Sequence, residues 1–469
     1  MVVAVSDLIS LRWVVEATYG AGAAAAAMTD MRITGESLEQ TTENRRSSEL
    51  RDDAQIEDDK RVNIGVTGSV EGLFSYLTWD TWMMYALRAA AWSTAVTTTM
   101  TTYSIDDGDN SINDDGAAYG ATASLAITTN DTITRDGGSW ITEGFRVGMV
   151  VTCASSEDVG NDGDHTITVL TATVMTIGAA GLTDNGADTA MLITNAGGFL
   201  TDTYVANQWI EIRGFTTSAN NGYFKIVSVV AAKMVLAGGT VVTEVAGDSV
   251  TVLMGAQITN GTTLKSMSIE REYSSPAAEF VEYQGCVIDG MTIGINAKDI
   301  ITISFDILGQ SGASAAATVG DGAPVAVNTN VTYSAQEDVN DVLENNGSIE
   351  ATMISLAVRN NYRLRDNILG VLGPDSAGAG KFEATGEMQM LYESKTIMDK
   401  YLAYTDTSFA VVLEDPSGNA YIIEVIEANY TSGKRVAGGE NEDIIADMAF
   451  AGHRDGSEDA TLRIVKFPA

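Results

Sequence analysis

VNIGVTGSVEGLFSY at residues 62–76 is followed by WDTWMMYALRAAAW at residues 79–92, and the hydrophobic period changes between them. In the first stretch, apolar side chains such as Ile64 and Val70 alternate with polar ones, which predicts a strand with one buried face. In the second, bulky side chains recur every three or four residues after Asp80, which predicts a short amphipathic helix with Asp80 as its N-cap. We therefore expect a long strand that leads directly into a helix.

Similar strands recur near the C-terminus. Residues 299–309, 382–393 and 443–453 each alternate apolar and polar side chains. Residues 394–402 favour a second short helix, and residues 409–423 favour a β-hairpin with an Asp-Pro-Ser-Gly turn. The sequence therefore predicts a mainly β frame with one or two short flanking helices.

Acidic residues dominate the charge of the chain. Its 469 residues include 63 acidic and 27 basic side chains, for a formal net charge of −36. A field of this sign repels nucleic acids and acidic membrane surfaces, so neither is an expected docking partner. An adaptation to high salt is an alternative explanation of the charge. The length suffices for two or three domains.

The N-terminal region predicts a soluble protein that is made and folded in a cytoplasm. Residues 1–7 lack the basic start of a secretory signal, and the apolar residues 21–28 are too few to span a bilayer. Cys153 and Cys286 are too few for a disulfide framework, and the sequence leaves open whether they pair.

An internal repeat occupies residues 121–255. Phe145, Gly163 and Met175 recur 59 residues later as Tyr204, Gly222 and Met234, and Gly137 recurs as Gly197. The repeat predicts two small all-β domains in tandem, at residues 121–194 and 195–255, inserted through an exposed loop and displayed on an outer surface. Residues 101–120 are expected to be an acidic linker; the register of a calcium loop is missing there.

Five segments resemble the tail tube proteins of long-tailed bacteriophages. They are MRITGESL (31–38), SELRDD (48–53), the predicted strand and helix at residues 62–92, GEMQMLY (386–392) and GENEDI (439–444). The resemblance covers residues 11–100 and 256–469. It implies a β-sandwich or barrel frame built from residues 1–120 and 256–469, interrupted by the two small domains.

The resemblance also implies a function. Six subunits of such proteins close a ring, each gives four strands to an inner barrel of about 24 strands, and the rings stack into a tube for DNA ejection. The implied partners are further copies of the chain, the tape measure protein, the tail terminator and the tail tip proteins. The implied location is the virion tail, assembled in the host bacterial cytoplasm. Three segments are candidates for the contacts between rings: residues 8–30, expected to be an extended arm or linker, residues 36–61, and residues 309–337, expected to be a long loop. For the charged run at residues 36–60, a solvated hairpin is an equally weighted alternative.

The polar sides of the predicted frame strands carry acidic side chains. We expect these carboxylates to line the lumen, where they repel the phosphates of passing DNA: Glu71, Asp306, Glu383, Glu387, Glu393 and Asp447. The alternative is a set of ordinary solvent-facing strands in a β-sandwich.

Nothing in the sequence points to catalysis. His165 is replaced by Phe224 in the second repeat, and His453 stands at a strand end, so neither is expected to be catalytic. We expect no enzyme activity, cofactor or metal. The main alternative function is a secreted or surface adhesin or carbohydrate-binding protein, for which Trp140 and Trp209 are candidate binding aromatics. A glycosidase and a membrane pore are weaker alternatives.

Overall fold

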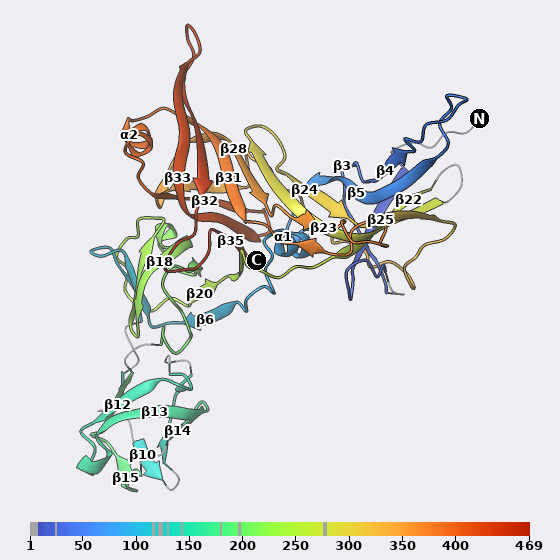
Figure 1. Ribbon diagram of the computed structural model, residues 1–469. Coiled ribbons are helices and arrows are strands. Elements are labelled where there is room, and N and C mark those ends of the chain that lie inside the picture. The colour runs from blue at the N-terminus through green and yellow to red at the C-terminus, as the bar shows by residue number, and fades with distance from the viewer. Residues whose placement is uncertain are drawn as a thin grey trace. The chain divides into compact units, whose positions relative to one another are not determined.

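The computed structural model describes residues 8–23, 26–114, 118–120, 125–128, 131–141, 143, 145–178, 181–195, 198–274 and 279–469. The chain divides into two compact units, Met1–Ser93 with Gln257–Ala469, and Thr94–Ala256. Both are built from β-strands, which confirms the expected fold class (Figure 1). No helix in the described part of the chain is long and apolar enough to cross a membrane.

The first unit contains two β-sandwich modules of the same topology, which we call module A and module B. Module A consists of β1 (Ile9–Val15), β2 (Thr29–Asp30), β3 (Gly35–Glu36), β4 (Glu39–Arg46), β5 (Asp59–Leu73), α1 (Asp80–Ala86), β22 (Met267–Tyr273), β23 (Glu279–Asn296), β24 (Thr302–Gly309) and β25 (Ser311–Ala315). Module B consists of β26 (Val339–Glu344), β27 (Gly347–Ser348), β28 (Ala351–Arg359), β31 (Glu383–Leu391), α2 (Thr396–Ala403), β32 (Thr407–Glu414), β33 (Ala420–Ala437), β34 (Ile444–Gly452) and β35 (Leu462–Phe467). The small strands β21 (Ala256–Thr259), β29 (Arg363–Leu364) and β30 (Ala377–Gly378) complete the unit.

The strand pairings show that the two modules are copies of one fold. β23 and β33 are both 18 residues long. β23 pairs with β22, β24 and β25, and β33 pairs in the same way with β32, β34 and β35. Both long strands have a register shift in each of their first two pairings, at corresponding places. β5 leads into α1 as β31 leads into α2.

The two modules share one continuous sheet. Its strands follow the order β4, β5, β24, β23, β28, β31, β34, β33, and the pairing of β23 with β28 joins module A to module B. The segments 299–309, 382–393 and 443–453, predicted as strands, are β24, β31 and β34. We call these eight strands the shared sheet. Each module extends one hairpin of it, β4–β5 or β33–β34, beyond its sandwich (Figure 1).

The strand and helix at residues 62–92 lie at the centre of module A. Val66, Val70 and Phe74 are fully buried. The indole of Trp79 donates to the Leu73 carbonyl (2.9 Å), and the Trp82 ring packs 5.2 Å from Phe305 on the neighbouring strand. Asp80 is the first residue of the helix rather than its N-cap, and its carboxylate binds Lys466 Nζ at 2.5 Å.

The expected arm and the long loop are both attached to the sheets. Within residues 8–30, Ile9–Val15 form β1, which pairs with β22, so this part is a strand of the sandwich and not a free arm. Within residues 309–337, Ser311–Ala315 form β25, and the amide of Val325 donates to the Met28 carbonyl (2.8 Å).

The second unit contains two small β domains, one inserted into the other. The inserted domain consists of β9 (Ala118–Gly120), β10 (Leu125–Thr128), β11 (Thr132–Arg135), β12 (Val150–Ala154), β13 (Gly163–Leu170), β14 (Val174–Ile177), β15 (Gly186–Asp188) and β16 (Leu192–Asn195). The split domain consists of β6 (Val96–Met100), β7 (Tyr103–Asp106), β8 (Ser111–Asp114), β17 (Trp209–Arg213), β18 (Gly222–Val230), β19 (Lys233–Ala237) and β20 (Val250–Met254).

The repeat is visible in matching contacts. The side chain of Asn161 bonds to the backbone of Thr183 (2.9 and 2.8 Å), and Asn220 bonds in the same way to Val242. The repeat is longer than the sequence suggested, because β6–β8 occupy the places in the split domain that β9–β11 occupy in the inserted one. The described part of the expected linker at 101–120 therefore supplies strands, and its Asp- and Gly-rich residues form the turn of the β7–β8 hairpin. Gly197 and residues 115–117 lie outside the described residues.

Candidate functional site: the polar face of the shared sheet

The shared sheet has one apolar and one polar face. Residues paired across neighbouring strands point to the same side. One such row contains Val70, Phe305, Met291, Val358 and Ala384, all buried in the core. The adjacent row contains Ser69, Asp306, Gly290, Arg359 and Glu383, and it defines what we call the polar face.

Five of the six predicted lumen residues lie on the polar face. Glu71 on β5 is opposite Ser304 on β24, and Asp306 lies on the same side of β24 as Ser304. Glu383 and Glu387 are on β31, and Asp447 on β34 is opposite Gln389. The strands that carry them belong to one sheet, but β23 and β28 separate the pair β5–β24 from the pair β31–β34.

Glu393 differs from the other five. β31 ends at Leu391, so Glu393 follows the strand, where its exposed side chain borders a hollow of about 250 Å³ beside the start of α2. The strand predicted at 382–393 ends earlier because Ser394 begins the turn into α2, with its hydroxyl accepting from the Thr396 amide (3.3 Å).

The sequence did not identify the basic residues of the polar face. Arg359 Nη1 lies 2.6 Å from Asp306 Oδ2, and Lys434 Nζ lies 2.9 Å from Asp447 Oδ2. The Arg359 pair spans β23 at Gly290, where an added Cβ would lie only 2.7 Å from the Asp306 carboxylate. Both ion pairs are partly exposed, so they contribute little to stability, but they neutralise two of the predicted carboxylates.

Several carboxylates of the polar face keep their charge unpaired. Within the described residues, Glu71, Glu383 and Glu387 are exposed and form no ion pair with a basic side chain. Glu39 on β4 shares this face, because it is opposite Thr67 in the ladder with β5, and it was missed because residues 36–61 lack clear alternation. The polar face therefore has a surplus of negative charge.

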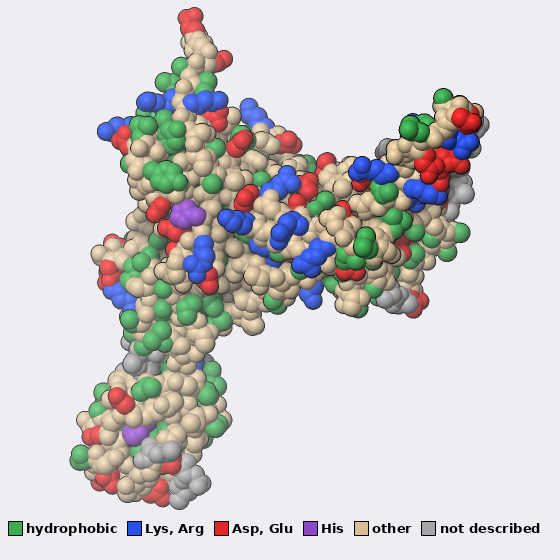
Figure 2. Space-filling model, viewed as in Figure 1, with side chains coloured by type: hydrophobic (Ala, Val, Ile, Leu, Met, Phe, Trp, Pro, Cys, Tyr) green, Lys and Arg blue, Asp and Glu red, His purple; other side chains and the backbone are tan. Residues whose placement is uncertain are grey.

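Short side chains separate these charges. One row across the sheet reads Ser304, Thr292, Ala357, Thr385 and Ala451. Side chains of this size leave a smooth surface. Figure 2 shows side chains of both signs on the visible face of the molecule, and acidic side chains at the tip of the β33–β34 hairpin. Glu440, Glu442 and Asp443 at this tip are exposed.

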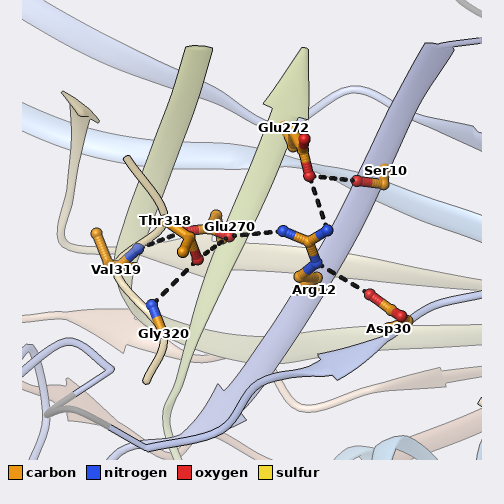
Figure 3. A network of polar contacts seen from close by, with 8 residues as sticks. All are labelled: Ser10, Arg12, Asp30, Glu270, Glu272, Thr318, Val319 and Gly320. Atoms are coloured by element: carbon orange, nitrogen blue, oxygen red, sulfur yellow. Dashed lines mark hydrogen bonds and ion pairs between the residues drawn. The ribbon is translucent and has the colours of Figure 1, made fainter. Parts of the chain in front are cut away.

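A partly buried ion network fixes the loop at residues 309–337 to the layer of module A that contains β1 and β22. Arg12 on β1 contacts Asp30 (2.9 Å), Glu270 (3.3 Å) and Glu272 (2.7 Å), as Figure 3 shows. The fully buried Glu270 also accepts hydrogen bonds from the Thr318 hydroxyl (2.8 Å) and the Val319 amide (2.6 Å). Since a buried charge without partners is costly, these contacts hold the loop at residues 318–320 against β22.

The histidines, the cysteines, two tryptophans and one acidic cluster were the other candidates for a functional site. Asp406, Glu427 and His453 place ligand atoms within 4.8 Å of one another, but Asp406 is exposed and the others are half-buried. The His165 ring contacts the Asn161 carbonyl (3.1 Å). Cys153 and Cys286 are free, buried thiols, and burial raises the pKa of Cys153 to about 12. Trp140 and Trp209 are buried, which removes them as binding aromatics of an adhesin.

The family comparison agrees with this architecture. The family model for the phage tail tube protein matches residues 6–222 and 235–452, most of the chain. No curated protein matches the chain. The resemblance of residues 31–38, 48–53, 62–92, 386–392 and 439–444 had implied a mainly β virion component of this kind. The chain belongs to the phage tail tube proteins.

Proposed function

We propose that the chain assembles into stacked rings whose shared sheets close a barrel, and that the polar face lines the lumen through which DNA is ejected. The observation that supports this most is the shared sheet itself. It is continuous through both modules, its apolar face is buried, and its polar face carries unpaired carboxylates beside short side chains.

The charge of the face explains how such a conduit would work. DNA gains affinity from a protein mainly by exchanging condensed counterions for basic side chains. A wall with a negative surplus offers no such exchange and repels the phosphates, so the duplex slides without binding. Ring closure also removes the open edges of the sheet, which otherwise invite uncontrolled pairing.

The remaining proposals rest on the resemblance to the family. The resemblance implies a ring of six subunits, each giving four strands to an inner barrel of about 24 strands. We propose assembly in the host bacterial cytoplasm, with the tape measure, tail terminator and tail tip proteins as partners. The inserted and split domains are proposed to decorate the outer surface of the tube.

Neutralising the unpaired carboxylates tests the lumen assignment. The triple variant Glu71→Gln, Glu383→Gln, Glu387→Gln keeps side-chain size and leaves both ion pairs of the face intact. We expect tubes of normal length in electron micrographs, with DNA release from variant phage slowed severalfold in a dye-fluorescence assay.

The matched control removes the same charge from the second unit by Asp136→Asn, Glu157→Gln and Asp184→Asn, all exposed. It should release DNA at the normal rate. If the triple variant alone fails to form tubes, the three glutamates are interface groups and the lumen assignment is wrong. Normal DNA release by the triple variant also contradicts it.

A further inference from the structure

The junction between modules A and B shows how one chain would join the next. At this junction the outer edge of β23 pairs with the outer edge of β28. Gly290 is opposite Arg359, and Thr292 is opposite Ala357. Because the modules are copies of one fold, β33 of module B corresponds to β23, and β4 of module A corresponds to β28. The free edges of the shared sheet are therefore those of β33 and β4.

The register of the two modules can be matched residue by residue. The register shift after Ile288 on β23 corresponds to the shift after Tyr430 on β33. Beyond the shift, Gly290 is opposite Asp306 in module A, and Ser432 is opposite Ala449 in module B. Gly290 therefore corresponds to Ser432. Thr292 then corresponds to Lys434.

On the β4 side, Asp306 pairs with Ser69 as Ala449 pairs with Glu387. Ser69 is opposite Ser37, whose amide donates to the Ser69 carbonyl (2.9 Å). Glu387 is opposite Ser355. Ser37 therefore corresponds to Ser355. Counting along the ladders, Glu39 corresponds to Ala357 and Thr41 to Arg359.

We infer that β33 of one chain pairs antiparallel with β4 of a second copy, with Ser432 opposite Thr41 and Lys434 opposite Glu39. This inference rests on the proposed ring assembly and specifies its interface. The contact is heterologous and repeats the β23–β28 step at every junction, as closure into a ring requires.

The two edges are suited to this pairing. In the described part of the chain, β4 pairs only with β5, and residues 432–437 of β33 pair only with β34. Ser432, Lys434, Glu39 and Thr41 are all exposed. An opposite-charge pair directly across two strands is favourable, so Lys434 and Glu39 fix the register. The Leu38 carbonyl already accepts from the Tyr283 hydroxyl (2.9 Å). The backbone hydrogen bonds between the two chains therefore begin at Gln40, next to the side-chain pair of Glu39 and Lys434.

The number of chains in the ring follows from the duplication. Each chain contributes the eight strands of the shared sheet, four from each module. A barrel of about 24 strands therefore closes with three chains rather than six.

Disulfide trapping tests both the register and the number. In the double variant Thr41→Cys, Ser432→Cys, oxidation of assembled tubes should yield covalent dimers and trimers on denaturing gels, with no larger product. The control Thr42→Cys, Ser432→Cys places the first thiol on the other face of β4 and should yield no such products. A ladder that reaches six chains contradicts the three-chain ring. Tubes that form without cross-links contradict the register but leave the proposed function intact.

Charge exchange gives a second readout that does not depend on cysteines. Lys434→Glu and Glu39→Lys should each impair tube formation, and the double exchange should restore it. Rescue distinguishes the contact between chains from the Lys434–Asp447 pair within one chain. Absence of rescue contradicts the pairing. If the unaltered chain forms neither rings nor tubes, the proposed function fails, and this inference fails with it.

Discussion

Single residues set the packing between the strands of module B. Gly386 on β31 lies beneath the Phe450 ring of β34, and a Cβ added there would be 2.1 Å from a ring atom. The ladder between β31 and β34 holds the backbone, and the Phe450 ring stacks on the Phe409 ring with 4.2 Å between centroids, so neither can move away easily. Gly386 is therefore required by close approach rather than by backbone conformation.

We predict that Gly386→Ala destabilises module B by about 1–3 kcal/mol through overpacking. Gly456→Ala is the matched control, because an added Cβ there meets no atom within 4 Å. Chemical unfolding of the full chain should separate the two variants. Equal stability of both would show that the Phe450 ring moves freely.

The Asp188 carboxylate makes the stability of the inserted domain depend on pH in the acid range. Burial alone would raise its pKa, but the amides of Glu157 (2.7 Å), Ala190 (2.9 Å) and Met191 (3.0 Å) donate to it and bring the pKa below its ordinary value. A lowered folded-state pKa means that the contribution to stability is present above the unfolded-state pKa. It is lost as the pH falls through the folded-state pKa.

Asp188→Asn should therefore destabilise the inserted domain at neutral pH by about 1–3 kcal/mol, the range for hydrogen bonds to a buried acceptor. It should also flatten the decline in stability below about pH 4. Hydrogen exchange at residues 150–195 of the full chain measures both effects, with exposed Asp184→Asn as the control. An unchanged acid profile would contradict the assigned role.

At the scale of elements, one arginine connects the two small domains of the second unit. Arg146 of the inserted segment contacts Asp114 at the end of β8 (3.0 Å) and Asp202 before β17. The Asp114 side chain is fully buried, and burial raises the pKa of Asp202. The corresponding place in the inserted domain holds a pair of its own, Arg135 with Glu143 (2.6 Å).

Arg146→Met should destabilise the split domain by about 3–5 kcal/mol, because two carboxylates lose their shared cation. Adding Asp114→Asn and Asp202→Asn should recover a large part of the loss, since no charge is then left buried. Thermal unfolding of the unaltered chain, the single variant and the triple variant tests this. A triple variant as unstable as Arg146→Met would show that the guanidinium acts by packing alone.

The elements that could be predicted are those with one buried face. β5, β24, β31 and β34 alternate clearly and were found with nearly correct ends. β23 was missed because it passes from one layer to the other and is buried on both sides over much of its length. The β7–β8 hairpin was missed because its turn residues resemble a linker, and its partner β19 lies more than 100 residues away.

The site was only partly visible in the sequence for a related reason. Alternation gave the correct face for Glu71, Asp306, Glu383, Glu387 and Asp447, but a single strand does not show which strands are its neighbours. The order in the sheet, and with it the pairing of Asp306 with Arg359 across Gly290, depends on contacts between distant segments. Module duplication was hidden because the copies share strand lengths and register shifts rather than side chains.

At the scale of the whole molecule, duplication changes how the ring is built. A chain with two tube folds forms half of its module junctions inside the polypeptide, at β23–β28, and leaves the other half to contacts between chains. Junctions within a chain form at high effective concentration. The contact between β33 and β4 is therefore expected to limit assembly, and substitutions there should affect tubes more than folding.

A helical reconstruction of the assembled tube by electron cryomicroscopy tests the central proposal most directly. We predict a hollow barrel in which the shared sheets run edge to edge and Glu71, Glu383 and Glu387 face the lumen. A tube with these three side chains on its outer surface, or buried between subunits, would contradict the account.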